Sequence, residues 1–204
     1  MTKKAWTFGC LGLIILAVVI AVVAGAETYN KLNTLDQQVR AQWAQVENVY
    51  QRRADLIPNL VETVKGAAQF EKETFTAVTE ARSRVGQVTS EGLENIVNNP
   101  ETMANFQAAQ DGLSSALSRL LVVMERYPEL TATQNFKDLQ VQLEGTENRI
   151  TVERMRFNES AQAFNTKRMS FPTVLFAGIF GQRFAEKAYF KAQSGAETAP
   201  KVKF

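Results

Sequence analysis

The sequence predicts an all-α protein in which one N-terminal transmembrane helix continues into a long antiparallel bundle of about four helices. An uncharged run of 22 residues stands near the N-terminus, at 5–26. In the rest of the chain apolar residues recur three and four positions apart, which is the spacing of one helix face. No stretch shows the sustained alternation that is typical of a half-buried strand.

The uncharged run, AWTFGCLGLIILAVVIAVVAGA, is long enough to cross a membrane. As a helix it spans about 33 Å, against a bilayer hydrocarbon core of about 30 Å. A cleaved secretory signal is the alternative, since Ala24-Gly25-Ala26 offers small residues for cleavage. The helical spacing continues past Tyr29, however, so we predict a retained transmembrane helix after a short tail at residues 1–4.

Two features of this segment bear on its packing and orientation. Small residues fall four positions apart on one face, a spacing that permits close helix–helix packing: Ala17, Ala21 and Gly25. Lys3 and Lys4 precede the span, whereas Lys31 and Arg40 follow it. The positive-inside rule narrowly favours a cytoplasmic N-terminus and an extracytoplasmic body.

The first part of the body, 27–191, continues the same helix. One stripe of apolar residues follows the span: Leu32, Leu35, Val39, Trp43, Val46, Tyr50, Ala54, Ile57, Val61, Val64 and Ala68. Because the stripe runs through Pro58 without changing face, we predict one helix over 27–65 that is kinked at Pro58. A weaker stripe predicts a helix over 67–89, and Gly66 between them is either a bend or a break.

Residues 86–99, rich in Gly and Asn, predict a loop, with Asn99 as the N-cap of a helix over 100–127 and Pro100 at its first position. That helix has a regular seam: Met103, Phe106, Gln110, Leu113, Leu117, Leu120, Met124 and Tyr127. Gln110 is its polar member. It either lies at a wet edge, which we favour, or is buried and sets the register against a partner helix.

Two further helices complete the predicted bundle, at 131–167 and 172–191, before a flexible tail at 192–204. The seam of the first is Phe136, Leu139, Leu143, Thr146, Ile150, Glu153, Phe157, Ala161 and Phe164. The uncharged segment 171–180 is too short to span a membrane. It either packs on the bundle core, which we favour, or lies in the membrane interface. The residues that would make the interface contact are Phe171, Leu175, Phe176, Ile179 and Phe180.

Composition excludes several classes of chemistry. The chain has no histidine and one cysteine, so it has no Ser-His-Asp or Cys-His catalytic set, His-ligated zinc site or intrachain disulfide. The net charge of +2 is accounted for by Lys3 and Lys4, and a neutral body gives no electrostatic footprint for nucleic acid. We predict no catalytic residues, metal, cofactor or small-molecule substrate. The rival prediction is a carboxylate metal site that includes Glu153.

The densest polar cluster surrounds Pro58. Its members are Arg52, Arg53, Asp55, Asn59, Glu62 and Lys65. One interpretation is that these side chains satisfy the carbonyl that Pro58 leaves without a partner. The other is that they form a docking surface for a protein.

Residues around this cluster also carry a family resemblance. The stretch WAQVENVYQRRADLIPNLVETVKG, 43–66, resembles the signature of the LemA family, and so do the segments YPEL and LEGTENRI, within 127–150. Asn-Phe at 135–136, Phe-Asn at 157–158, Asn165 and the Phe-Pro pair at 171–172 match as well, so that the likeness covers about 28–190. The chain departs from the family pattern at Ala54, Ala67 and the Phe-Glu pair at 70–71.

The resemblance implies a membrane-anchored helical bundle of the bacterial cell envelope, without an established catalytic activity. We therefore expect a non-enzymatic interaction or scaffold protein of the inner membrane that contacts the lipid bilayer and a protein partner or further copies of itself. The alternatives are an adaptor or regulator of a membrane protease or membrane-shaping assembly, and a carboxylate-based metal-binding bundle.

Overall fold

The computed structural model describes residues 2–67, 71–89 and 92–192. These ranges hold helices and turns without a strand, which confirms the all-α class. The long helices are α1 (Thr2–Thr63), α2 (Lys72–Thr89), α4 (Pro100–Met124) and α6 (Gln134–Met169). The short ones are α3 (Leu93–Asn98), α5 (Pro128–Thr131) and α7 (Thr173–Ile179), with 3-10 turns at Lys65–Ala67 and Gly181–Phe184.

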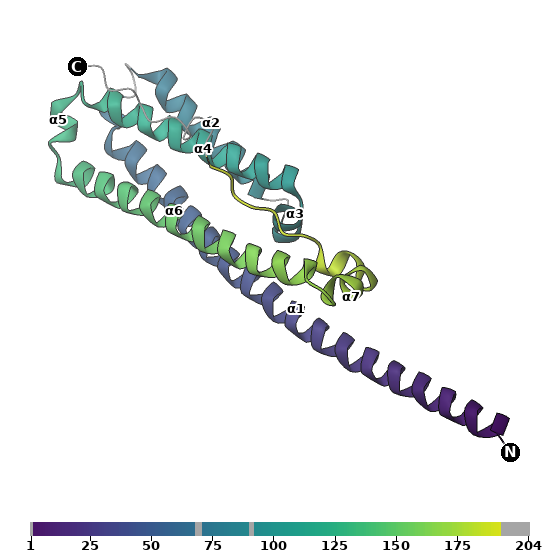
Figure 1. Ribbon diagram of the computed structural model, residues 1–204. Helices are drawn as coiled ribbons and strands as arrows, with labels where there is room; N and C mark the ends of the chain where they lie inside the picture. Colours follow the sequence, from purple (N-terminus) through teal and green to yellow (C-terminus); the bar gives the residue numbers. More distant parts are fainter. Residues whose placement is uncertain (1, 68–70, 90–91, 193–204) are drawn as a thin grey trace, which may run out of the picture.

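Helix α1 dominates the architecture. Its 62 residues extend for about 93 Å and continue through Pro58. The first half projects away from the other helices, and the second half forms one edge of the bundle (Figure 1). Large apolar side chains from Leu11 to Val23 are 52–68% exposed, while burial against the bundle begins at Thr28. The predicted continuation of the apolar segment into the body, without a hinge, is confirmed.

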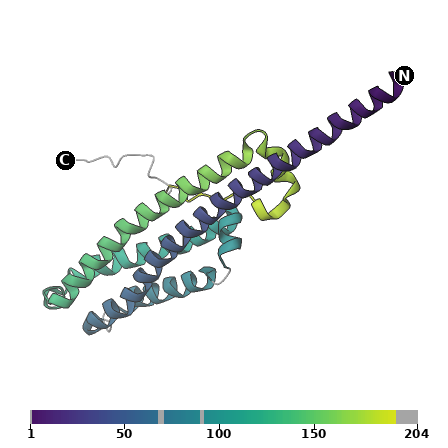
Figure 2. The same ribbon diagram turned by 90° about the horizontal axis from the view of Figure 1, so that it is seen from below.

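The body is a bundle of two helix pairs. Helix α6 runs along α1, and α2 runs along α4 (Figures 1 and 2). Apolar side chains form two core clusters. One surrounds Trp43, Phe106 and Phe157, and the other surrounds Leu60 and Leu120 at the opposite end. Each cluster draws on α1, α4 and α6, so burial of apolar surface holds the two pairs together.

The segment before α4 differs in part from the prediction. The Asn99 side chain accepts from the backbone N–H groups of Glu101 and Thr102, so the predicted N-cap is confirmed. The loop predicted at 86–99, however, is helical up to Thr89 and again in α3. Ile96 and Val97 explain this, because both are buried in the core and their burial outweighs the loop-forming composition. Gly92, at φ 85°, supplies the left-handed turn that starts α3.

The helix predicted at 172–191 is wrong in its second half. After α7 and the 3-10 turn, residues 185–192 are extended; we call this segment the strap. It runs back along the bundle, in yellow in Figure 1. The apolar positions that suggested a helix are buried against the bundle instead, among them Ala188 and Phe190. The tail predicted at 192–204 lies, apart from its first residue, outside the described residues.

Side-chain amides hold the strap as a neighbouring strand would. Asn165 accepts from the backbone N–H of Lys187 and donates to its carbonyl, both at 2.9 Å. Asn158 makes the same pair of bonds with Phe190, also at 2.9 Å. Gln107 of α4 pairs with Lys191 at 2.7 and 3.0 Å. The backbone N–H and carbonyl groups of Lys187, Phe190 and Lys191 are thereby satisfied without a β-sheet.

The spacing of the two asparagines matches the strap. Each follows a buried phenylalanine, Phe157 or Phe164, and they lie seven residues apart on α6. Seven helical residues rise by about 10.5 Å. Three residues of extended chain, the separation of Lys187 and Phe190, cover about 10 Å. The Phe-Asn repeat of α6 therefore fits an antiparallel extended segment.

A buried ion pair anchors the strap near its start. Lys187 Nζ lies 2.6 Å from Asp36 of α1, with the two side chains 2% and 6% exposed. Asp36 also accepts from Arg40 at 2.9 Å. Burial acts to raise the pKa of Asp36, but hydrogen bonds and charge from Arg40 and Lys187 outweigh it and lower the pKa below its ordinary value of 3.8.

We predict that Asn165→Ala lowers the free energy of unfolding by about 2 kcal/mol, because the N–H and carbonyl of Lys187 lose their buried partner. Urea titration of the full chain in detergent, followed by circular dichroism, measures the change. Asn148→Ala, at an exposed position of the same helix, is the matched control and leaves stability nearly unchanged. If Asn165→Ala and Asn148→Ala lowered the free energy of unfolding equally, the bonds between Asn165 and the strap would not contribute to stability.

We also predict a pH dependence from Asp36. Because its folded pKa is depressed, its contribution to stability is present above the ordinary pKa and is lost as the pH falls through the folded value. Between about pH 4 and pH 2, the stability of the wild-type chain should therefore fall more than that of Asp36→Asn. Urea titrations across this range test it. Asp138→Asn, at an exposed position, should follow the wild type.

Candidate functional site

The polar cluster around Pro58 divides between the surface and the interior. Five of the six residues predicted as a docking surface are exposed on α1 and the 3-10 turn that follows it: Arg52, Asp55, Asn59, Glu62 and Lys65. Asp55 accepts from Gln51 at 2.7 Å, and Lys65 lies 3.2 Å from Glu62. These are contacts along one exposed helix face, which remains available to a partner.

Arg53 does not belong to that surface. Its residue is 1% exposed, so the prediction that it contributes to a docking face is wrong. The reason lies in the helix geometry: position 53 follows Tyr50 by three residues and precedes Ile57 by four, so it falls within the core-facing stripe. Ala54, the stripe member inferred from the sequence, is half-buried instead.

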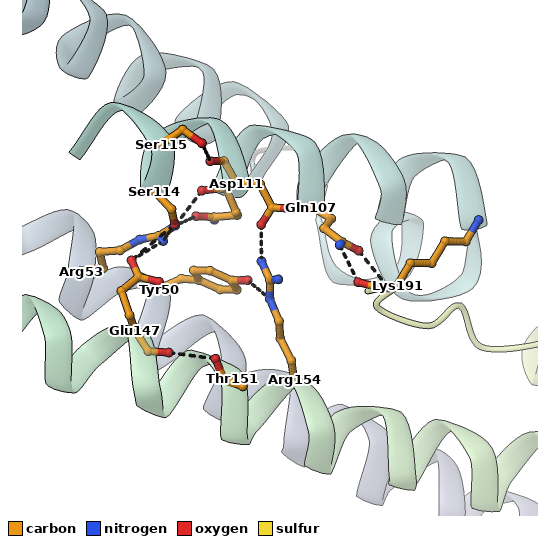
Figure 3. A network of polar contacts seen from close by, with 11 residues as sticks. Tyr50, Arg53, Gln107, Asp111, Ser114, Ser115, Glu147, Thr151, Arg154 and Lys191 are labelled. Atoms are coloured by element: carbon orange, nitrogen blue, oxygen red, sulfur yellow. Dashed lines mark hydrogen bonds and ion pairs between the residues drawn. The ribbon is translucent and has the colours of Figure 1, made fainter. Parts of the chain in front are cut away.

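Inside the bundle, the Arg53 guanidinium joins three helices (Figure 3). Nη1 donates to Ser114 of α4 at 2.6 Å and to Glu147 of α6 at 2.8 Å. Nη2 donates to the Gln110 carbonyl at 3.3 Å and also to the Gln110 side-chain oxygen. Gln110 is 2% exposed, so the structure supports burial and not the wet edge that we favoured. The contact fixes α4 against α1 at one register.

A second arginine extends the network toward the strap. Arg154 of α6 donates to the Tyr50 hydroxyl at 2.6 Å and to Asp111 at 3.0 Å. Its guanidinium carbon also lies 5.1 Å from the ring centroid of Phe190 in the strap. Figure 3 shows Tyr50 between the two arginines. The network therefore links α1, α4, α6 and the strap through charge-assisted hydrogen bonds and cation–π contacts.

These groups are arranged for structure more than for catalysis. Burial raises the pKa of Tyr50, which stays protonated at neutral pH and is a poor base. Glu153, the residue of the rival metal prediction, is half-buried and bonded to Arg156 at 2.8 Å. Among the described residues, no three Asp, Glu or Cys side chains gather as metal ligands. The arrangement gives the rival prediction no support.

Two further sets of predicted contact residues lie on the apolar half of α1 and in segment 171–180. Of the small residues on the apolar helix, Ala17 and Ala21 are exposed. Gly25 faces α7 of its own chain, and a Cβ there would lie 3.3 Å from the Phe176 ring. Phe180 packs edge-on against Tyr29, with ring centroids 5.3 Å apart. One face of α7 thus covers the bundle, as the favoured interpretation held.

The remaining predicted interface residues of segment 171–180 point outward. Phe171 is 81% exposed, Leu175 60% and Ile179 78%. Sequence reasoning did not separate these from Phe176 and Phe180. It also did not identify Asp36, Asn158 or Gln107, whose side chains hold the strap. For Asn158 and Asn165 a signal existed, the Phe-Asn pair repeated after seven residues.

We predict that Arg53→Met destabilises the bundle by about 2–3 kcal/mol, because Gln110 and Ser114 lose a buried partner while the half-exposed Glu147 is resolvated. Arg52→Met, the neighbouring exposed arginine, is the control and should change stability little. Urea unfolding of the full chain measures both. If Arg53→Met unfolds at the same urea concentration as the wild type, the network contributes nothing to the free energy of unfolding.

Comparison with known proteins places the chain in a family. The model of the LemA family matches residues 42–204. Magnetosome protein MamQ 2 of Paramagnetospirillum magneticum is 25% identical over 198 residues, covering 90% of this chain and 72% of that protein. Magnetosome protein MamQ of Magnetospirillum gryphiswaldense is 25% identical over 202 residues, covering 92% and 74%. Since the family model covers most of the described body, including the Arg53 network, this protein is a member of the LemA family.

Proposed function

We propose that this protein is a single-pass membrane scaffold that acts without catalysis and holds a protein partner, or further copies of itself, at a fixed distance from a bacterial inner membrane. One observation carries the proposal: the exposed apolar half of α1 continues without interruption into the bundle. An apolar surface of this extent is unfavourable in water and favourable in a bilayer. The helix is also long and apolar enough to cross a membrane.

The polar interior supports a mechanical role. The buried cations Arg53 and Lys187 are each paired with a carboxylate. Groups bound to one another in this way stabilise one arrangement of the helices. The named relatives are magnetosome proteins, a description that specifies no reaction.

The proposed docking face is the exposed side of α1 around Pro58, without Arg53. Charges of both signs alternate there, from Arg52 and Asp55 to Glu62 and Lys65. Such a surface suits a partner of complementary charge pattern. We place the N-terminus in the cytoplasm and the body outside it, because Lys3 and Lys4 precede the span.

The test combines membrane retention with partner capture. We expect the full chain to stay in membranes washed at high pH and to be cross-linked there to another protein or to a second copy. Arg52→Glu should reduce the cross-linked product several-fold by reversing a charge on the docking face. Arg149→Glu reverses an exposed charge on α6 and should leave the product unchanged.

Two results would refute the scaffold proposal. The first is release of the wild-type chain by the high-pH wash. The second is a cross-linking pattern that contains only the single chain, in the wild type as in both variants.

A further inference from the structure

The outer face of α7 is apolar and exposed. It consists of Phe171, Val174, Leu175 and Ile179, which are between 42% and 81% exposed. Met169, just before it, is 62% exposed. Leu175 and Ile179 lie four positions apart and share one side of α7, with Val174 beside them, while Phe171 stands in the turn that precedes the helix. A cluster of this kind on a short helix is unfavourable in water.

The inner face holds α7 firmly in position. Thr173 and Ala177 are buried, and Phe176 contacts Gly25 of α1. Arg183, in the 3-10 turn that follows α7, donates to Asn33 of α1 at 3.3 Å. These contacts fix which side of α7 turns outward, so the exposure of the outer face is a consequence of packing and not of a loose segment.

The position of α7 along α1 identifies what can cover the outer face. Gly25, its contact on α1, belongs to the last turn of the predicted span 5–26. Both views place α7 beside α1 at the point where α1 leaves the bundle (Figures 1 and 2). If the span crosses a bilayer, lipids surrounding its last turn reach the same level as Leu175 and Ile179. The apolar surface of α1 up to Val23 also ends next to α7.

Charged side chains around this level suit a lipid surface. Lys31 and Arg183 are exposed, and Lys167 is half-exposed. They lie just beyond the apolar face, where phosphate groups of a bilayer stand. Acidic residues stand nearby as well: Glu27 and Glu186 are exposed, and exposed Glu159 lines one pocket with Lys31 and Lys167.

From these observations we propose that α7 is a second membrane contact, which inserts Phe171, Val174, Leu175 and Ile179 into the boundary between headgroups and acyl chains. The proposal rests on the transmembrane placement of α1 proposed above and adds to it. In this arrangement the bundle touches the bilayer at two places, the span and α7. Two contacts on a rigid body fix its tilt as well as its distance from the membrane.

Site-directed spin labelling of the full chain tests the proposal. In a Cys10→Ser background, single cysteines are introduced as Leu175→Cys and Ile179→Cys. The labelled chains are reconstituted into vesicles of phosphatidylcholine and phosphatidylglycerol. Because oxygen concentrates in the acyl region and a nickel chelate stays in water, we expect the ratio of oxygen to nickel collision rates to be several-fold higher than at an aqueous site.

Val141→Cys on α6 is the matched control, since Val141 is an apolar residue that is 67% exposed away from α7. It should report water. If Leu175→Cys and Ile179→Cys give the same ratio as Val141→Cys, α7 stands in water and the proposal is overturned. If both are shielded from oxygen and nickel alike, a protein surface or a second copy covers the face, and the proposal is overturned too.

A third label separates this proposal from the proposed function. Leu16→Cys lies in the middle of the predicted span and should report the acyl region. A lipid signal at position 16 together with an aqueous signal at 175 would refute only the α7 contact. An aqueous signal at position 16 would refute the membrane anchor and, with it, both proposals.

Discussion

The continuity of α1 is the constraint on which the rest of the structure depends. A single helix must present apolar side chains outward on every side from Leu11 to Val23 and then confine them to one stripe from Thr28 onward. The backbone can do both because an α-helix satisfies its own hydrogen bonds in any surroundings. The change from apolar side chains on every side to a single apolar stripe is therefore made by the side chains alone, within about one helical turn. The stripe packs on α6 and shares both core clusters with α4, so the orientation of the bundle relative to the first half of α1 depends on residues of one helix.

Apolar seams by themselves leave the register of such a bundle open. The seams of α4 and α6 repeat every three and four residues, so a shift of one heptad would again place apolar residues opposite apolar residues. The Arg53 contacts remove this degeneracy, because a shifted α4 would bring neither Gln110 nor Ser114 to the guanidinium. Burying a cation costs free energy of desolvation, and Glu147 with the neutral acceptors offsets part of it. The network thus contributes more to the choice of one arrangement than to stability.

Local sequence pattern predicted the long helices, the cap at Asn99 and the passage of α1 through Pro58, because these features depend on local chemistry. It failed where tertiary contacts decide. Arg53 was assigned to the surface on its charge, although its position in the stripe was available. The helix predicted at 172–191 gives way to the strap in its second half because Ala188 and Phe190 pack against side chains of α1, α4 and α6 that no local pattern identifies. For segment 171–180, one face packs on the bundle, as the favoured alternative held, and the other face is exposed, so the membrane-interface alternative stays a prediction.

Helix α7 and the strap contact α1 near the point where it leaves the bundle and further along its buried half. An isolated helix that leaves a bundle is held at its base only by the residues of the last turns, and small movements there become large displacements at its far end. Helix α7 contacts α1 at Gly25, and Tyr29 lies between the rings of Phe180 and Phe184. The strap then runs on to place Phe190 parallel to Trp43, with centroids 6.0 Å apart. Since Gly25 and Trp43 are 18 residues apart on α1, about 27 Å, one continuous segment clamps α1 at two distant levels and transfers the rigidity of the aromatic core to the emerging helix.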